Sequence, residues 1–311
     1  MVLGVVNVWA VRARWSFSRR LFHTTHTSRE PMRLAYEQFL PESTDRLVAK
    51  RTQALVVCHG LFGSKQNWRS LAKSMAKGFG VPIYTLDMRN HGSSPHSDDM
   101  TYAQMADDVK SFLQEQQLSN VTLVGHSMGG KVVMALALDP SLPESTLSHL
   151  VSVDMSPAEG AISSEFMEYT RCMVKIEDMK VQSRSEADKE LQKVESNLPV
   201  RQFLLTNLER DEESGTMRFR IPVKTLLHCL ESIGLFPYSP PKDDSSAPER
   251  VWNGPTLFVK GEHSKYINRH NLPLCRAFFP SMKLVTLPTG HWCQSEKPKE
   301  FMQELQAFLE K

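Results

Sequence analysis

Short apolar runs rich in β-branched residues recur along the chain and alternate with longer segments of helical periodicity. Each run has the length of a buried strand and is too short for a buried helix. The segments between them carry apolar residues three and four positions apart, as in Trp68–Met75, Met105–Leu113 and Phe301–Leu309. This alternation predicts an α/β fold with a mostly parallel sheet that has helices on both faces. The predicted strands are Ala54–Cys58, Ile83–Leu86, Val121–Val124, Leu150–Val153, Thr256–Val259 and Leu284–Leu287.

One stretch interrupts the alternation. Between Ser163 and Arg250 no run has the pattern of a buried strand, and the apolar residues recur at helical spacing. We predict a mostly helical insertion over residues 158–250, with a core formed by residues 30–157 and 251–311. Because the insertion separates strands of one sheet, we expect a cap over the carboxyl edge of that sheet. An independent helical domain is the alternative.

The first 29 residues differ in composition from the rest of the chain. They contain five Arg, several Ser and Thr, and no acidic residue. Without them 32 basic side chains would face 35 acidic ones, so the formal net charge of +2 comes from this segment. An arginine-rich, hydroxyl-rich and acid-poor N-terminus is typical of a mitochondrial transit peptide. We therefore predict a leader over residues 1–29 and a location in the mitochondrial matrix; an untargeted disordered tail is the alternative.

Composition argues against several other classes of protein. A hydrophobic content of 41% is enough for a buried core and speaks against a mostly disordered chain. No apolar run reaches the roughly 18 residues of a membrane-spanning helix, and a net charge of +2 is too small to indicate nucleic acid as the main partner. The five cysteines are far apart and form no C-x-x-C pair, so neither a disulfide framework nor a zinc cluster is expected.

The sequence Gly125-His126-Ser127-Met128-Gly129 fits the pattern G-x-S-x-G. It follows a predicted strand and precedes a nearly all-apolar helical segment, which is the strand–turn–helix context of a nucleophile elbow. The glycines allow neighbouring backbones to pass closely in a strained turn. Ser127 is therefore the candidate nucleophile.

A nucleophilic serine needs a base, and that base needs an orienting carboxylate. His291 follows the last predicted strand, where its loop can reach the elbow, and is the candidate base. Two acids, Asp154 and Glu262, keep the chain order serine, acid, histidine. We prefer Asp154 because it directly ends a predicted strand and so faces the same crevice as the elbow. Glu262 is the alternative, in the loop after Thr256–Val259.

The loop His59-Gly60-Leu61-Phe62-Gly63 follows the strand Ala54–Cys58. In hydrolases with such an elbow, this loop supplies one backbone N–H to the oxyanion, and the residue after the nucleophile supplies another. The candidate donors are the N–H groups of Leu61 and Met128. No metal or organic cofactor is expected, because the chain lacks H-E-x-x-H, a Walker A string and a G-x-G-x-x-G after its first strand.

Together these motifs resemble the α/β-hydrolase superfamily. The similarity to its mitochondrial members and their bacterial esterase relatives runs from about residue 34 to the end. The strings that carry it are HGLFGSKQNW (59–68), DMRNHGSSPHSDDMTY (87–102), VGHSMGGK (124–131), VDMSPAE (153–159), GHW (290–292) and, in the predicted cap, VRQFLLTNL (200–208). Many superfamily members place the acid in a G-x-x-D loop, whereas Gly261-Glu262-His263-Ser264 has serine in that position.

The resemblance implies an eight-stranded sheet with a helical lid. It also implies a serine esterase or acylglycerol lipase, such as a diacylglycerol lipase, in mitochondria. It supports Asp154 as the acid and implies a link to the lipoylated 2-oxoacid dehydrogenase complexes.

Several questions stay open at this level. A thioesterase, a carbon–carbon hydrolase or a cofactor-free haloperoxidase would also keep the serine, and a partner-binding protein, with or without catalysis, could use the same fold. Apolar residues of the predicted cap either line an acyl pocket or pack against the core. These residues are Phe166, Met167, Met173, Phe203, Leu204, Leu205 and Phe236.

Overall fold

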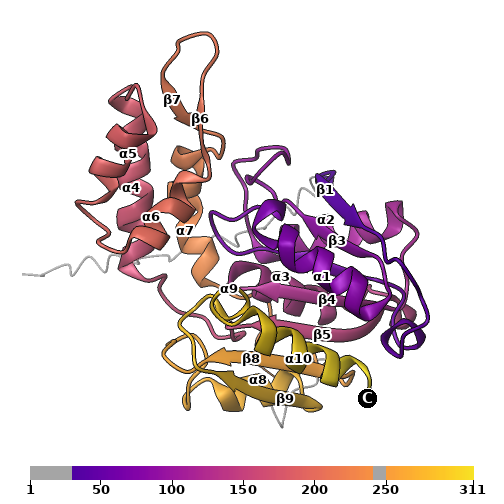
Figure 1. The fold of residues 1–311 in the computed structure, drawn as a ribbon. Coiled ribbons are helices and arrows are strands. Elements are labelled where there is room, and N and C mark those ends of the chain that lie inside the picture. The colour runs from indigo at the N-terminus through magenta and orange to yellow at the C-terminus, as the bar shows by residue number, and fades with distance from the viewer. Residues whose placement is uncertain (1–29, 241–249) are drawn as a thin grey trace, which may run out of the picture. The chain divides into compact units, whose positions relative to one another are not determined.

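The computed structural model describes residues 30–240 and 250–311 (Figure 1). The predicted leader lies outside the described residues. The main sheet has seven strands in the order β1-β3-β2-β4-β5-β8-β9, and every neighbouring pair is parallel except β1 and β3. This confirms the predicted mostly parallel α/β fold. The strands are β1 (Tyr36–Phe39), β2 (Leu55–Cys58), β3 (Ile83–Leu86), β4 (Val121–His126), β5 (Leu147–Val153), β8 (Thr256–Gly261) and β9 (Met282–Leu287).

The expected eight strands are corrected to seven in the part of the chain that the structure describes. There, a single antiparallel strand, β1, precedes β2. The connection between them, residues 40–54, is made of turns and the short helix η1 (Val48–Lys50). It also contains Pro41, which has no backbone N–H to give to a ladder.

The sheet is covered on both faces, which explains why its strands read as continuous apolar runs. Along β2, Leu55 and Val57 join one buried cluster, and Val56 and Cys58 join the other. The first cluster includes the apolar faces of α1 (Arg69–Phe79) and α10 (Pro298–Leu309). The second includes those of α2 (Tyr102–Glu115), α3 (Met128–Ala137) and α8 (Leu272–Phe278). The short helices η2 (Lys65–Trp68), η3 (Glu144–Thr146) and α9 (Cys293–Glu296) lie in connections.

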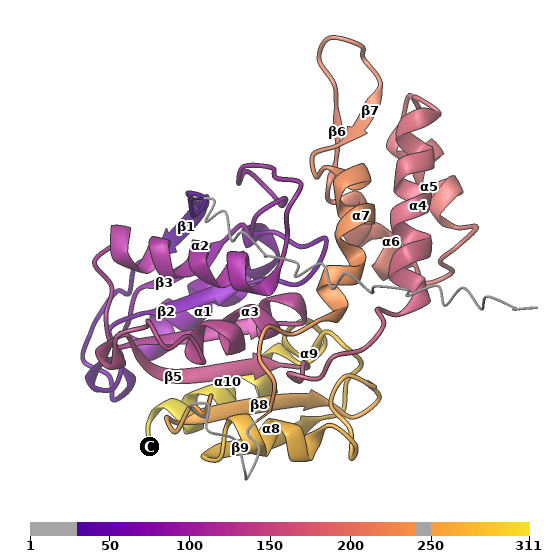
Figure 2. The same cartoon turned by 180° about the vertical axis from the view of Figure 1, so that it is seen from behind.

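Among the described residues, four helices and a small hairpin separate β5 from β8, its neighbour in the sheet. They stand beyond the carboxyl ends of the strands (Figures 1 and 2). The helices were expected; the hairpin was not, because each of its strands has only three residues. The domain boundaries at 158 and 250 stay a prediction. These elements, called the cap below, are α4 (Ser164–Asp178), α5 (Arg184–Leu191), α6 (Leu198–Leu205), β6 (Leu208–Arg210), β7 (Met217–Phe219) and α7 (Val223–Gly234).

The two ends of the cap meet at a pair of glycines. The Gly160 N–H donates to the Gly234 carbonyl over 3.0 Å. A Cβ on Gly234 would lie 2.4 Å from the Gly160 oxygen, so the two backbones can approach this closely only without a side chain there.

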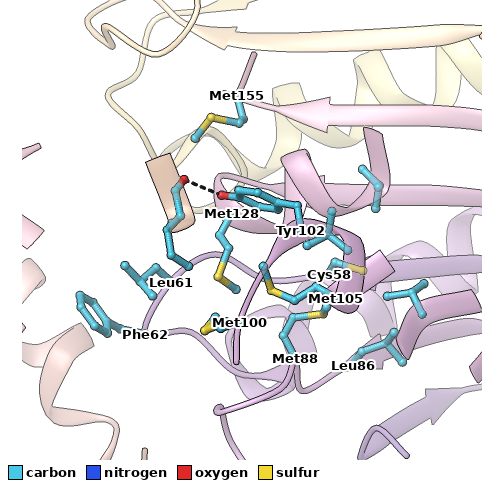
Figure 3. Close-up of a cluster of buried hydrophobic side chains, with 14 of the residues drawn as sticks. Cys58, Leu61, Phe62, Leu86, Met88, Met100, Tyr102, Met105, Met128 and Met155 are labelled. Carbon is cyan, nitrogen blue, oxygen red and sulfur yellow. Dashed lines mark hydrogen bonds between the residues drawn. The ribbon is translucent and has the colours of Figure 1, made fainter. Parts of the chain in front are cut away.

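Two core side chains hold the end of α7. The Tyr102 hydroxyl donates to the Ile233 carbonyl over 3.0 Å (the dashed line in Figure 3). The buried Lys131 ammonium donates to the carbonyls of Gly234 and Leu235, at 3.1 and 2.9 Å. Within the described residues, no helix combines the length and the apolar character that crossing a membrane requires.

Candidate active site

Ser127 lies in the tight turn between β4 and α3. Its φ of 54° and ψ of −120° are unusual for a residue with a side chain, so the turn is strained. The flanking glycines make the turn possible. A Cβ on Gly125 would lie 2.1 Å from the Gly129 oxygen, and one on Gly129 would lie 2.3 Å from the Cys58 oxygen. This is the elbow geometry that the sequence predicted.

The structure brings Ser127, His291 and Asp154 together. The His291 Nε2 lies 2.9 Å from the Ser127 Oγ, and the His291 Nδ1 lies 2.7 Å from the Asp154 Oδ2. Asp154 is completely buried at the carboxyl end of β5, and His291 is in the connection between β9 and α9. When Nδ1–H donates to the carboxylate, Nε2 is left to accept the serine proton.

Two further donors hold the Asp154 carboxylate. Its Oδ1 accepts the Gly261 N–H over 2.9 Å, and its Oδ2 accepts the Ser264 hydroxyl as well as His291. Ser264 is the residue found where many superfamily members carry aspartate. Glu262, the alternative acid, is exposed, and the carboxylate that contacts the His291 ring is that of Asp154. Sequence reasoning missed the role of Ser264, although its place in the G-x-x-S loop was visible.

The candidate oxyanion donors, Leu61 and Met128, both lie beside the nucleophile. Both residues line one cavity together with Ser127, and Figure 3 shows Leu61 between Phe62 and Met128. Among the hydrogen bonds of the described residues, none uses either N–H group. Met128 begins α3, and the first N–H groups of a helix have no acceptor within it. Both donors are therefore free to meet an oxyanion.

Three buried histidines, His59, His91 and His126, lie in or beside the loop His59–Gly63 and next to His291. Burial lowers the pKa of His91 and of His126 to about 3 and also lowers that of His59, so all three are neutral near pH 7. The second cause at His126 is the nearby His291 ring, whose centroid is 4.8 Å away. The His126 Nε2–H donates to the His291 carbonyl over 2.9 Å, which fixes the backbone of the candidate base.

A family model described as alpha/beta hydrolase fold matches residues 53–298, which is most of the chain. The chain belongs to the α/β-hydrolase fold family. Within the described residues of this hydrolase-fold chain, no group of three or more His, Cys, Asp or Glu side chains is placed to hold a metal ion.

Relatives of this hydrolase-fold chain carry two kinds of name. The sn-1-specific diacylglycerol lipase ABHD11 of Mus musculus is 40% identical over 82% of this chain and 80% of its own length. A probable alcohol acetyltransferase of Saccharomyces cerevisiae is 36% identical over 83% of this chain and 77% of its own length. Among solved structures, a marine microorganism esterase is 31% identical with a TM-score of 0.77, over 89% of this chain and 99% of that one.

Three cavities meet at the candidate site of this α/β hydrolase. Their volumes are about 100, 370 and 290 Å³, and the Phe166 side chain of α4 lines all of them. Phe203 and Leu204 of α6 line the third, beside His291. The apolar cap residues therefore divide into three groups. Phe166, Phe203 and Leu204 line the site, and Leu204 also belongs to the buried core cluster. Met173, Leu205 and Phe236 are buried in that cluster without lining the site, and Met167 lines a separate groove between α4 and α7.

Two aromatic rings flank the His291 ring. The Tyr266 ring centroid lies 4.2 Å from it and the Trp292 centroid 5.6 Å. Burial raises the pKa of Tyr266 to about 12, so its hydroxyl stays protonated and carries no charge beside the base. Sequence reasoning did not single out Tyr266, because nothing in its local sequence marks it.

Proposed function

We propose that this chain is a serine hydrolase that cleaves carboxylic esters of lipid-like substrates, as a diacylglycerol lipase or a related esterase. The observation that carries this proposal is the hydrogen-bonded series Ser127, His291 and Asp154 beside two free backbone N–H groups. The lipase and esterase names of its relatives support the same reaction. The apolar side chains of Phe166, Phe203 and Leu204 support an acyl chain as the group bound under the cap.

The mechanism follows from the geometry of these groups. The Ser127 Oγ attacks the ester carbonyl while the His291 Nε2 takes its proton. Asp154 holds the imidazole in the required tautomer and stabilises the imidazolium. The N–H groups of Leu61 and Met128 bind the oxyanion. His291 then protonates the leaving alcohol, and a water molecule activated by the same ring releases the acyl group.

A second candidate is acyl transfer to an alcohol, which the acetyltransferase name of the yeast relative favours. The acyl-enzyme would be the same, and an alcohol would attack it in place of water. A thioester would enter by the same route, so thioesterase activity is a third outcome of a substrate search. A protein that only binds partners is disfavoured, because a buried carboxylate lies beside His291.

The test is labelling of the protein by a fluorophosphonate probe, together with hydrolysis of a diacylglycerol. We expect both to occur in the wild type and to be lost in Ser127→Ala, because only an activated serine reacts with the probe. Circular dichroism of Ser127→Ala controls for folding. Label or turnover retained by a folded Ser127→Ala protein would contradict the proposal.

We also propose a location in the mitochondrial matrix, supported by the arginine-rich, acid-free residues 1–29. A fluorescent reporter carrying residues 1–29 is expected to enter mitochondria, and a reporter that stays in the cytosol would contradict this. A link to the lipoylated 2-oxoacid dehydrogenase complexes rests on resemblance alone and stays a prediction.

A further inference from the structure

The loop His59–Gly63, called the oxyanion loop below, has a backbone hydrogen bond to a buried side chain of the cap. The Asn207 Nδ2 donates to the Phe62 carbonyl over 2.8 Å, across 145 positions of sequence. It also donates to the Leu204 carbonyl over 3.3 Å. Both partners are acceptors, so the amide nitrogen, and not the oxygen, must face them. Asn207 and Phe62 are both buried, at 2% and 0% exposure, so water does not replace this bond.

Asn207 is itself fixed within the cap. It follows α6, and its own N–H donates to the Leu204 carbonyl over 3.2 Å. Its carbonyl accepts the Arg220 N–H over 2.8 Å, which ties it to the end of the hairpin. The Phe62 carbonyl is therefore held by a framework that belongs to the cap.

Three consecutive peptide groups of the oxyanion loop are held by side chains. The His59 Nδ1–H donates to the Gly60 carbonyl over 2.8 Å, and the Phe62 N–H donates to the His91 Nε2 over 3.0 Å. The third is the Asn207 bond to Phe62. Because a peptide group is planar, holding the Gly60 oxygen sets the direction of the Leu61 N–H on the same group. Two of the three holds come from the core, and Asn207 supplies the third.

Phe62 is the strained residue of this loop. Its φ is 62°, in the left-handed region that an aromatic side chain rarely occupies. Such a conformation persists only where its surroundings hold it. The peptide group after Phe62 has a second bond, because its Gly63 N–H donates to the Gly60 carbonyl over 2.9 Å. With the Asn207 bond removed, this peptide group keeps only the Gly63 bond and can rotate. The Gly60 carbonyl shares a peptide group with the Leu61 N–H, so this rotation would turn the Leu61 N–H away from the nucleophile.

We infer that Asn207 is a positioning residue, through which the cap holds the oxyanion loop in its active conformation. This inference rests on the proposed function. Asn207 touches no reacting atom, and its effect acts through the Leu61 N–H. Oxyanion donors stabilise the transition state more than the bound substrate, so loss of the bond lowers kcat and leaves KM nearly unchanged. A misplacement of this kind can cost about 10- to 100-fold in kcat.

The test compares Asn207→Ala and Asn207→Leu, which is close to asparagine in shape and has no donor, with Cys229→Ala. Cys229→Ala is the matched control, because it removes another hydrogen bond between cap and core, from the buried Cys229 thiol of α7 to the Asp98 carbonyl over 3.3 Å. With 4-nitrophenyl butyrate we expect kcat to fall about 10- to 100-fold in both Asn207 variants. KM should stay within about twofold of the wild type, and Cys229→Ala should keep a kcat near the wild-type value.

A second readout separates positioning from a loss of structure. A trifluoromethyl ketone adds to the serine and places an oxyanion in the hole, whereas the matching secondary alcohol cannot. We expect the Asn207 variants to lose affinity for the ketone in proportion to kcat and to bind the alcohol like the wild type. Equal loss for both inhibitors, or Asn207 variants that match Cys229→Ala, would overturn the inference.

The same experiment distinguishes a failure of the proposed function from a failure of the role of Asn207. A wild type that turns over no ester, or a Ser127→Ala protein that does, refutes the proposed function itself. A wild type that reacts through Ser127, with Asn207 variants equal to Cys229→Ala, refutes only the role of Asn207. If Asn207→Ala fails to fold, the Asn207→Leu protein carries the comparison, because it fills the same space and lacks the donor.

Discussion

The Asp154 carboxylate has three hydrogen-bond donors in a completely buried site: the His291 ring, the Gly261 N–H and the Ser264 hydroxyl. A buried carboxylate is costly unless its oxygens are satisfied, and charge-assisted hydrogen bonds are the strong ones. The Gly261 N–H of β8 holds Oδ1, and the Ser264 hydroxyl of the following loop shares Oδ2 with His291. The loop that carries the acid in many superfamily members here supports an acid that comes from β5.

This arrangement predicts unequal effects of two substitutions. Asp154→Asn removes the charge and allows the wrong imidazole tautomer, so we expect kcat to fall on the order of 10⁴-fold, as in serine proteases. Ser264→Ala leaves two of the three donors. We expect kcat to fall by no more than about 10- to 160-fold, since a single hydrogen bond to a charged group is worth about 1.5–3 kcal/mol. Steady-state ester hydrolysis measures both, with thermal unfolding as the control. Equal losses in the two variants would contradict this account of the carboxylate.

The sequence could predict the candidate site residues that a short motif or a place after a strand marks. Ser127 lies in an elbow string, and His291 follows the last strand. The choice between Asp154 and Glu262 could not be settled that way, because it depends on how far the loop after β9 reaches back across β8. Asn207 was missed for a similar reason. Its partner is 145 positions away in the sequence. Nothing in the mostly apolar segment 200–208 distinguishes Asn207 except its polar side chain.

At the scale of elements, the strands buried on both faces were predictable, as was the edge strand β9, whereas the edge strand β1 was not. The sequence of β1, Tyr-Glu-Gln-Phe, is mostly exposed and has only Phe39 fully buried, so it shows no apolar run. The hairpin β6–β7 is too short for a period of two to show. The cap helices showed their apolar spacing because each packs one face. Which of those apolar residues face the site rather than the core depends on how the helices pack, and spacing alone does not reveal it.

At the scale of the whole molecule, the neutral buried histidines near the site make the free energy of unfolding depend on pH. His59, His91 and His126 are all buried, and burial lowers the pKa of each. In the unfolded chain each would bind a proton near pH 6.5, whereas in the fold His91 and His126 bind it only near pH 3. The unfolded state therefore binds more protons between these values, and the free energy of unfolding falls as the pH is lowered.

This predicts acid lability that a single substitution reduces. Between pH 6.5 and 4.5 each such histidine lowers the free energy of unfolding by up to about 1.4 kcal/mol per pH unit. We expect His91→Asn to weaken this pH dependence and the exposed His228→Asn to leave it unchanged. Urea unfolding at several pH values measures the slopes. Parallel curves for wild type and His91→Asn would show that His91 is not a source of the dependence.

The contact between Gly160 and Gly234 joins the two ends of the cap, so the segment between them is a closed loop. The entropic cost of closing such a loop grows only with the logarithm of its length. A change of length between the two glycines therefore adds little to the cost of closure. It also lies outside β5 and β8, which hold the candidate acid and its supporting loop. A chain with a longer or shorter cap that still packs on the core keeps the proposed catalytic groups in place while the size of the binding cavity changes. The condition is that the new cap still presents a hydrogen-bond donor to the Phe62 carbonyl.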